Sequence, residues 1–369
     1  MTIHIFIAHM GVGGSERVCV NLANEWARLG NEVHIAVLNL ENDVNTHLLD
    51  SRIQIHELGV SRLRYSAVPM LKYLKKYKPS FIFVFGKEMA IIMNKLKKLK
   101  LTKVKVVVRI LNNVNIALAK EDNVSPIVEK YLQTAQKQLA DMDASIAQCK
   151  AMGKMVVEAG MVEESKLHVI YNPVSRELIE EVEKLRRTLN CEGSGRIAFI
   201  GRIDPQKQPD QLINAFKLVK EKMPEARLRI VGNGSLMQKT MQQVYDMGLE
   251  GDVIFDGIRK DMENVYADAD VVILSSQYEG MPNALIEAIG CGIPVVSYDC
   301  PIGPAEIIED GVNGFLCRQD DIEDLAEKTC IALKQSWDRD IIKATCKKFD
   351  VTEIAKKYIE IFAIQKGIE

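Results

Sequence analysis

The feature that most constrains this fold is a pattern of short β-branched and aromatic runs, each followed by a helical stretch, which occurs twice along the chain. In the first half the runs lie at 3–8, 33–38, 81–85, 104–110 and 144–148. In the second half they lie at 196–201, 227–232, 252–257, 270–275 and 294–298. Strands that alternate with helices form mostly parallel, doubly wound sheets. The sequence therefore predicts an α/β protein with two Rossmann-like domains facing a cleft.

The length of 369 residues also exceeds what one hydrophobic core usually supports. We place the boundary near Asn172 and Pro173, since proline disfavours the continuation of regular structure. The first domain is expected at 1–171 and the second at 172–349. Residues 350–366 form an amphipathic pattern with no strand after it. The segment 350–369 is therefore expected to be a helix that crosses back to the first domain.

Charge is distributed unevenly along the chain. Residues 1–170 hold 23 Lys and Arg against 16 Asp and Glu, and the remainder holds 25 against 34. Between Arg62 and Arg109 there are 14 basic residues and one acidic residue, Glu88. Aromatic residues are not interleaved there as a base-stacking surface requires, which argues against nucleic acid as a partner. Two interpretations stay open for residues 62–109: docking on an anionic membrane surface, or a solvated helix face.

The sequence argues against metal and disulfide sites, and against secretion or a membrane-spanning helix. The eight cysteines are scattered without a CxxC pair, which argues against a zinc site or a disulfide framework. The six histidines show no pairing at ligand spacing, and His9, beside a glycine-rich loop, is expected to be structural. No apolar window approaches the ~18 residues of a spanning helix, and no secretory signal is recognisable. We expect a cytoplasmic protein, peripheral on the inner face of the plasma membrane.

The first glycine-rich loop, Gly11-Val12-Gly13-Gly14, follows the first predicted strand and opens a helix. Glycines at such a position let a ligand approach the amides of a helix N-terminus, whose partial positive charge favours anions. As a dinucleotide fingerprint the loop is poor, because Glu16 stands where a small residue is needed and Asn39 where an acidic one is needed. A tight turn without a ligand is the alternative.

Cations and glycines follow the strands of the second domain. Gly201 and Arg202 end the strand 196–201, and Lys207 comes shortly after. Two cations beyond the carboxyl end of a central strand suit a diphosphate, although an exposed Arg and Lys on a loop would be unremarkable alone. Further glycine turns lie at Gly232, Gly234 and 303–306.

The stretch YEGMPNALIEAIG, residues 278–290, separates Glu279 from Glu287 by seven uncharged residues. A pair of catalytic acids is one interpretation of these carboxylates. With a helix beginning near Asn283, however, the two lie on different parts of one ligand's footprint. Asp268-Ala269-Asp270 has the spacing of a metal-binding DxD, but it directly precedes a strand, where Asp commonly closes a turn. No metal site is expected.

These motifs together resemble a known enzyme family. From Asn172 to Leu316 the sequences YNPV, IGRIDPQKQPDQLINAF, VGNGSL, LSSQYEGMPNALIEAIGCGIPVVS and EIIEDGVNGFL follow its pattern in order. GVGGSERV carries a weaker resemblance in the first domain. The chain is similar to retaining glycosyltransferases of the GT-B fold, group 1 or family 4.

The resemblance implies roles for individual residues. Arg202 and Lys207 would hold the diphosphate of a nucleotide sugar, Glu287 its ribose, and Glu279 would face the donor sugar. Glu279, Arg202 and Lys207 would thus be the catalytic residues. The rest of the donor site would comprise Gly201, Gly232, Gly234, Ile258, Gly280, Met281, Pro282, Asn283 and Ala284. The acceptor side would comprise Gly13, Gly14, Arg109, Asn112 and Asn113.

One departure from the family concerns the first domain. Many relatives carry a histidine just after the strand that corresponds to 104–110, close to the donor sugar. This chain has Asn112 and Asn113 there, and no histidine between His56 and His168. Either asparagine supplies the hydrogen bond, or the interaction is dispensable.

The expected activity is that of a retaining, metal-independent hexosyltransferase without a cofactor. Its donor would be a UDP-sugar, a hexose or N-acetylhexosamine, and its acceptor a lipid-linked glycan or surface polysaccharide such as lipopolysaccharide. An epimerase or phosphorylase of the same fold is an alternative, although no lysine for pyridoxal phosphate is recognisable. A non-catalytic nucleotide-sugar-binding subunit is another, favoured by the missing histidine and opposed by the complete donor motif.

Overall fold

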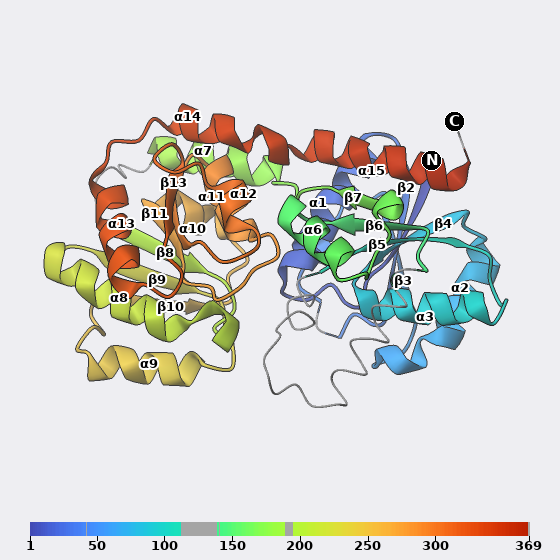
Figure 1. The fold of residues 1–369 in the computed structure, drawn as a ribbon, viewed down its shortest axis with the longest axis horizontal. Helices are drawn as coiled ribbons and strands as arrows, with labels where there is room; N and C mark the ends of the chain where they lie inside the picture. The colour runs from blue at the N-terminus through green and yellow to red at the C-terminus, as the bar shows by residue number, and fades with distance from the viewer. Residues whose placement is uncertain (42, 112–138, 140, 189–194, 368–369) are drawn as a thin grey trace. The chain divides into compact units, whose positions relative to one another are not determined.

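The computed structural model describes residues 1–41, 43–111, 139, 141–188 and 195–367, which belong to two compact units (Figure 1). Unit 1 comprises Met1–Pro173 and Asp350–Glu369, and unit 2 comprises Val174–Phe349. Each described strand pair is parallel. The expected fold class, two doubly wound parallel sheets with helices, is confirmed.

Unit 1 contains a seven-stranded sheet in the order β3-β2-β1-β4-β5-β6-β7. Its strands are β1 (Thr2–Phe6), β2 (Glu32–Val37), β3 (Gln54–Glu57), β4 (Phe81–Phe85), β5 (Lys105–Arg109), β6 (Ala144–Ala147) and β7 (Leu167–Val169). Its described helices are α1 (Gly14–Arg28), α2 (Ala67–Tyr77), α3 (Lys87–Lys98), α6 (Lys150–Glu158) and α15 (Val351–Lys366). Short 3₁₀ turns are η1 (Thr46–Leu48), η2 (Leu63–Tyr65) and η4 (Glu164–Lys166).

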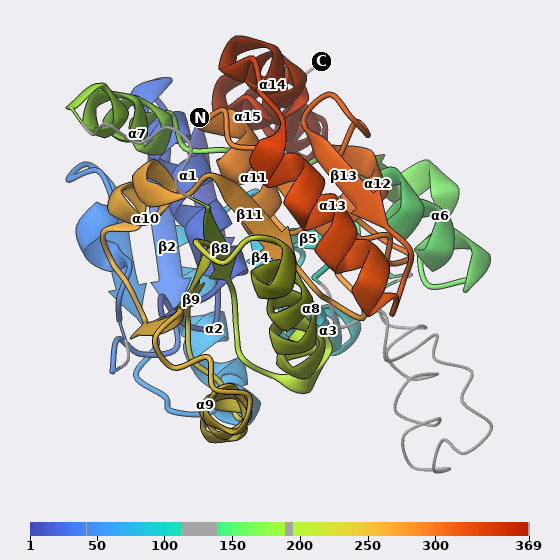
Figure 2. The ribbon, with the colours of Figure 1, turned by 90° about the vertical axis from the view of Figure 1, so that its left-hand side faces the viewer.

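Unit 2 contains a six-stranded sheet in the order β10-β9-β8-β11-β12-β13. Its strands are β8 (Arg196–Ile200), β9 (Arg227–Val231), β10 (Val253–Gly257), β11 (Val271–Leu274), β12 (Val295–Tyr298) and β13 (Gly314–Cys317). Its helices are α7 (Arg176–Thr188), α8 (Pro209–Lys222), α9 (Met237–Asp246), α10 (Met262–Asp268), α11 (Asn283–Gly290), α12 (Pro304–Ile307), α13 (Ile322–Lys334) and α14 (Arg339–Thr345). Turns η5 (Pro205–Lys207) and η6 (Cys346–Phe349) complete it, and α8 packs beside α13 (Figure 2).

The ten hydrophobic runs identified in the sequence each overlap a strand, but three strands were not predicted. These are β3, β7 and β13, and each lies at an edge of its sheet. They are three or four residues long, and β3 and β7 are at most half-buried. An edge strand that is partly exposed, as β3 and β7 are, needs no continuous apolar run, so its sequence carries little signal. Strand β13 is largely buried, but it has only four residues and begins with glycine, which is too short a pattern to recognise.

The last helix, α15, belongs to unit 1. The buried Trp26 of α1 donates its indole N–H to the Ala355 carbonyl at 3.1 Å. Phe362 stacks on Phe81 of β4 with ring centroids 4.7 Å apart. These contacts place α15 in the core of unit 1, which Figure 1 shows in red beside α1.

Unit 1 extends to Pro173, two residues beyond the expected limit of 171. Asn172 accepts a hydrogen bond from Arg109, and the Pro173 carbonyl accepts one from Asn21 at 3.4 Å. Both donors belong to unit 1, and they hold the end of this segment in it.

Three histidines that the sequence left unpaired lie in a row across β1, β2 and β3. The His4 and His34 rings stack with centroids 4.6 Å apart, and His34 and His56 follow at 5.2 Å. Tyr73 of α2 bonds His4 Nδ1 at 2.8 Å, and Tyr77 lies 3.3 Å from His56 Nδ1. Burial and the neighbouring His34 lower the pKa of His4 from 6.5 to about 4.

Stability should therefore fall as the pH drops from about 6.5 toward 4. The unfolded chain binds a proton at His4 more readily than the folded chain does, so acid favours unfolding in this window. Between pH 7 and 5 the wild type should lose about 2 kcal/mol more unfolding free energy than a His4→Gln variant. Urea unfolding at a series of pH values measures the difference.

The exposed His47 provides the control, since His47→Gln should keep the wild-type pH dependence. If the unfolding free energy of the wild type and of His4→Gln depended equally on pH, the result would contradict the lowered pKa of His4.

Candidate functional site

The candidate site of unit 2 lies where its strand order reverses. From β8 the chain passes to β9 and β10 on one side, and β11, β12 and β13 lie on the other. Loops that leave two neighbouring parallel strands at such a point diverge, and ligands of open α/β sheets bind there. Gly201 and Arg202 follow β8, Glu279 follows β11, and Gly232 follows β9.

An ion pair joins the loops that follow β8 and β11. Lys207 Nζ lies 2.5 Å from Glu279 Oε1, and the two side chains are only 12% and 6% exposed. The Ser275 hydroxyl donates to the Lys207 carbonyl at 2.7 Å. The Gln277 amide donates to the Gln206 carbonyl at 2.8 Å. The backbone thus holds both loops, so the two charges face each other where solvent screening is weak.

Arg202 lies at the exposed rim of the same site. Its side chain is 64% exposed, and its Nη1 lies 3.2 Å from Asp204 Oδ2. The amide and the hydroxyl of Ser235 both donate to Asp204 Oδ1 at 2.8 Å. These hydrogen bonds, with a smaller contribution from Arg202, lower the pKa of Asp204. Asp204 and Ser235 support the site and were not singled out from the sequence, because only folding brings β8 and β9 together.

The predicted glycines let the loops touch backbone to backbone. A Cβ on Gly232 would overlap the Gly201 carbonyl, and one on Gly234 would overlap the backbone of Ile203. A Cβ on Gly303 would lie 2.7 Å from the Gly280 carbonyl oxygen. Only glycine permits these close approaches.

Helix α11 begins at Asn283, where the sequence places it, and Pro282 is its N-cap residue. Gly280, Met281 and Pro282 are buried, whereas Asn283 and Ala284 are half-buried. Glu287 is 8% exposed, and its Oε2 accepts a hydrogen bond of 2.6 Å from the Tyr266 hydroxyl. Ile258, after β10, is 50% exposed. Tyr266, which orients Glu287, carried no recognisable signal in the sequence.

The two aspartates of the DxD sequence form ion pairs within unit 2. Arg196 lies 3.0 Å from Asp268 and 2.9 Å from Asp270. Arg229 lies 2.9 Å from Asp268. These contacts fix the turn before β11, which agrees with the interpretation of the motif as a turn.

The glycine-rich loop of unit 1 ends at α1, which begins at Gly14 after the N-cap residue Gly13. The buried Glu16 carboxylate lies 3.1 Å from His9 Nδ1 and accepts a hydrogen bond from the Ser15 hydroxyl. A Cβ on Gly13 would overlap that carboxylate. Glu16, which the sequence marked only as a departure from a fingerprint, thus occupies the space beside the helix start.

Arg109 requires a correction. It was expected on the acceptor side, but it is 1% exposed. Its Nε donates to the Tyr358 hydroxyl at 3.2 Å, and another of its nitrogens donates to Asn172 Oδ1. Burial lowers the pKa of Arg109. The residue therefore ties β5 to α15 rather than facing a ligand. Asn112 and Asn113 lie outside the described residues.

The close packing of Gly234 predicts a loss of stability in Gly234→Ala. The added methyl group would overlap the backbone of Ile203, and such overpacking costs about 1–3 kcal/mol. Gly251→Ala is the matched control, since a Cβ there meets no atom within 4 Å. Urea unfolding compares the two variants, and equal stability would show that the loop accommodates the methyl group.

Comparisons with known proteins identify families and folds that this chain resembles. Residues 194–335 match a family model described as glycosyl transferases group 1, and residues 12–178 match one described as glycosyltransferase family 4. A poly(ribitol-phosphate) alpha-N-acetylglucosaminyltransferase of Staphylococcus aureus is 30% identical over 175 residues. That match covers 45% of this chain and 35% of the relative, so this chain spans about a third of the relative's length.

Two further proteins match over nearly their whole length. A Campylobacter jejuni alpha-1,4-N-acetyl-D-galactosaminyltransferase, which acts on a GalNAc-containing diphospho-undecaprenol glycan, is 24% identical; the match covers 100% of this chain and 99% of that one. The structure of Anabaena HepE in complex with UDP and glucose has a TM-score of 0.79 at 20% identity, covering 99% of this chain and 100% of that one. The latter establishes the shared GT-B fold.

Proposed function

Because the chain belongs to the group 1, family 4 glycosyltransferases, we propose that it transfers a hexose or N-acetylhexosamine from a UDP-sugar. The acceptor is a lipid-linked glycan or a surface polysaccharide, and the sugar keeps its anomeric configuration. The observation that carries this proposal is the buried Lys207–Glu279 pair between β8 and β11. Relatives that transfer N-acetylhexosamines and a structural neighbour that binds UDP support the donor class.

Two cations and a helix start would bind the donor diphosphate. Lys207 lies beside Glu279, and the exposed Arg202 has room to turn toward a ligand. The backbone amides of the first turn of α11 add partial positive charge, from residues after Pro282. Together they would stabilise the charge that accumulates on the departing diphosphate, without a metal ion in the proposed reaction.

The two glutamates would have separate tasks. Glu279 balances the charge of Lys207 until the diphosphate arrives, and its carboxylate then faces the donor sugar. Glu287, held by Tyr266, would accept hydrogen bonds from the ribose hydroxyls. The acceptor oxygen would form a bond to the anomeric carbon as the bond to the diphosphate breaks. The acceptor proton would pass to the departing phosphate oxygen, so no enzyme nucleophile is required.

Lys207→Met and Glu279→Ala should separate binding from turnover. Loss of Lys207 removes a charge-assisted contact to the diphosphate, so UDP affinity should fall about tenfold or more. Loss of Glu279 should abolish turnover and leave UDP affinity nearly intact. Calorimetry with UDP and transfer assays with a panel of UDP-sugars measure both, and NMR of the product reports its anomeric configuration.

Lys220→Met is the matched control. Lys220 is 15% exposed and lies 3.1 Å from Asp252, so the variant also breaks a largely buried ion pair, away from the site. It should retain UDP affinity. Full activity of Glu279→Ala would refute its role, and the absence of binding by every nucleotide sugar tested would refute the proposed function.

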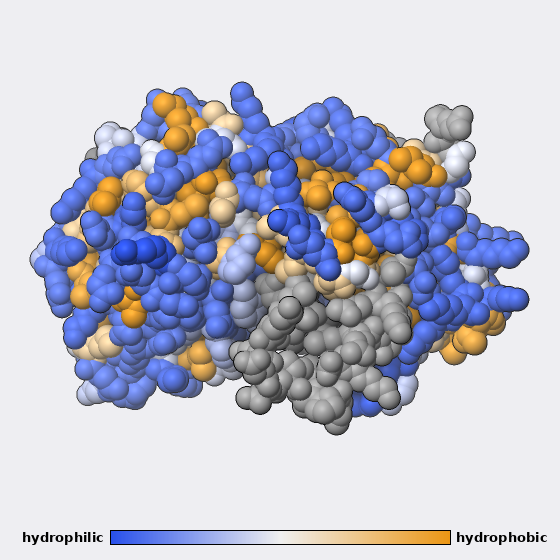
Figure 3. Space-filling model, in the orientation of Figure 1, coloured by the Kyte–Doolittle hydropathy of each residue, from blue (hydrophilic) through white to orange (hydrophobic). Residues whose placement is uncertain are grey.

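We also propose that α2 docks on an anionic membrane surface. Lys72, Lys75 and Lys76 of this helix are exposed, and Tyr65 and Val68 at its start are 58% and 62% exposed. Figure 3 shows hydrophobic residues interspersed with hydrophilic ones on the visible face. Among the described residues, no helix is long and apolar enough to cross a membrane.

Other basic residues of segment 62–109 have internal partners. Asp143 lies 2.5 Å from Lys97 and 3.1 Å from Lys105, and Asp141 lies 2.6 Å from Lys98. These lysines are therefore less available to an anionic surface than those of α2.

A Lys72→Gln/Lys75→Gln double variant should bind anionic vesicles at least about tenfold more weakly, since each lysine contributes about 1 kcal/mol near such a surface. The control Lys154→Gln/Lys347→Gln makes the same change of charge at exposed positions elsewhere. Co-sedimentation with phosphatidylglycerol vesicles at low and high salt measures binding. Equal loss in both variants, or binding that is insensitive to salt, would contradict docking through α2.

A further inference from the structure

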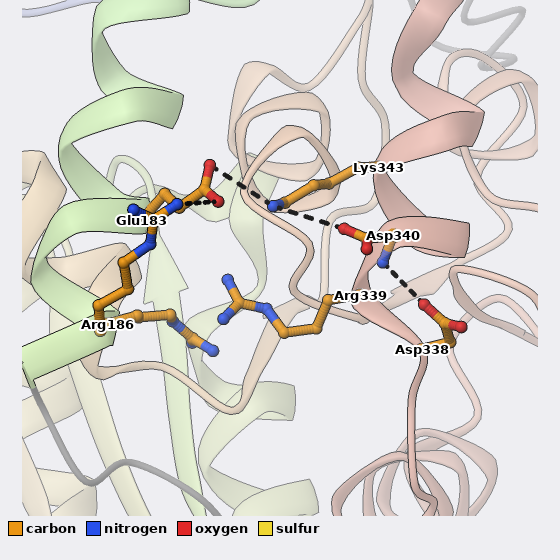
Figure 4. Close-up of a pocket in the computed structure, with 7 residues that line it drawn as sticks. Glu183, Arg186, Asp338, Arg339, Asp340 and Lys343 are labelled. Carbon is orange, nitrogen blue, oxygen red and sulfur yellow. Dashed lines mark hydrogen bonds and ion pairs between the residues drawn. The ribbon is translucent and has the colours of Figure 1, made fainter.

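A charged pocket of about 320 Å³ lies in unit 2, and none of the expected donor-site residues lines it (Figure 4). Helix α7 and the segment that begins α14 form its walls. Four cations and three carboxylates line it: Arg186, Arg187, Arg339, Lys343, Glu183, Asp338 and Asp340. Its volume exceeds that of a single small ion and is within the range of small-molecule sites.

Arg339 is the central cation of this pocket. One of its terminal nitrogens donates to the Cys291 carbonyl at 2.8 Å. Its Nε is buried and has no hydrogen-bond partner among the described residues. Nor does it form an ion pair with any carboxylate in the described part of the chain. A buried N–H donor without an acceptor is costly, and an anion in the pocket would supply one.

Two guanidinium groups point toward one another across the pocket. Arg186 reaches in from α7 and donates to the carbonyls of Tyr266 and Ala269, and Figure 4 shows it facing Arg339. Backbone carbonyls accept hydrogen bonds from both groups and orient them in the pocket. Like charges held in this way favour an anion between them.

The carboxylates lie toward the rim and already have partners. Asp338 accepts from the Asp340 and Ile341 amides and so caps α14. Glu183 pairs with Arg187 at 3.0 Å. Within the described residues, the ion pairs of Lys343 are long, 3.8 Å to Glu183 and 3.9 Å to Asp340. Lys343 can therefore turn inward, whereas the rim carboxylates repel large polyanions.

We propose that this pocket binds a phosphate group, either inorganic phosphate or the phosphomonoester of a small metabolite. The guanidinium fork matches two phosphate oxygens, and a second guanidinium and a lysine can contact the others. A tetrahedral dianion uses these converging donors more fully than a carboxylate does.

The two arginines that line the pocket also contact residues that position Glu287. The effect on UDP binding inferred from these contacts rests on the proposed function. Arg186 binds the Tyr266 carbonyl, and the Tyr266 hydroxyl donates to Glu287. Arg339 binds the carbonyl of Cys291, the C-cap residue of α11. Phosphate in the pocket should fix both arginines, preorganise Glu287 and tighten UDP binding about fivefold or more.

Phosphate binding is tested first without any nucleotide, so the result does not depend on the proposed function. Thermal unfolding of the full chain is followed against inorganic phosphate and glucose 1-phosphate at constant ionic strength. Binding to the folded state raises the midpoint temperature. Arg339→Gln should need at least about tenfold more ligand for the same shift, as expected for a lost charge-assisted hydrogen bond. Lys343→Gln should weaken binding less, and the tighter of the two ligands identifies the source of the phosphate.

Arg318→Gln is the control, because it removes an exposed arginine from the same unit and should leave the shift unchanged. Lys207→Met tests whether phosphate binds at the donor site instead. Shifts that persist in Arg339→Gln, or that disappear in Lys207→Met alone, would overturn the proposal. UDP titrations with and without phosphate then test the coupling between the pocket and the donor site. If phosphate tightens UDP binding in the wild type but not in Arg339→Gln, the coupling is supported. If phosphate weakens UDP binding in the wild type or leaves it unchanged, the coupling is refuted.

Discussion

The ion pair between Lys207 and Glu279 is the interaction on which the candidate site of unit 2 depends. Two charges that are almost completely buried are costly unless each finds its partner at good geometry. The fold meets this requirement because β8 and β11 are neighbours in the sheet, so the loops that follow them meet at one edge. Backbone contacts through Ser275 and Gln277 hold those loops in place. The same arrangement leaves the more exposed Arg202 free to respond to a ligand.

Local sequence patterns were sufficient to predict most of the strands and the fold class. A strand in the middle of a parallel sheet is buried on both faces, so its sequence is a continuous apolar run that can be recognised without a structure. The edge strands β3 and β7 lack this constraint and were missed, and the buried edge strand β13 was missed because it has only four residues. The start of α11 at Asn283 was also predictable, because a proline precedes it and an apolar helical pattern follows.

Contacts between distant residues could not be predicted in the same way. His4 and His34 lie opposite each other in neighbouring strands, whereas His56 lies opposite Ala36, two residues further along β2, and contacts His34 from there. No spacing in the sequence encodes this register. The family resemblance implied that Arg109 lies on the acceptor side, but its Nε donates to the hydroxyl of Tyr358, which comes from the other end of the chain. Asp141 and Asp143 likewise form ion pairs with lysines of segment 62–109, and these partners lie too far away in the sequence to be recognised from the count of lysines.

Helix α11 has only eight residues and is about 12 Å long, and its two ends contact different parts of unit 2. Its first turn directly follows the loop that carries Glu279, and the carbonyl of its C-cap residue Cys291 accepts a hydrogen bond from Arg339. Residues Leu285 to Gly290 are all buried, so the helix cannot move at one end without displacing packed neighbours. A short, tightly packed helix of this kind transmits a change at the arginine pocket to Glu287 more directly than a flexible loop would. The coupling we propose therefore follows from the length and burial of one helix.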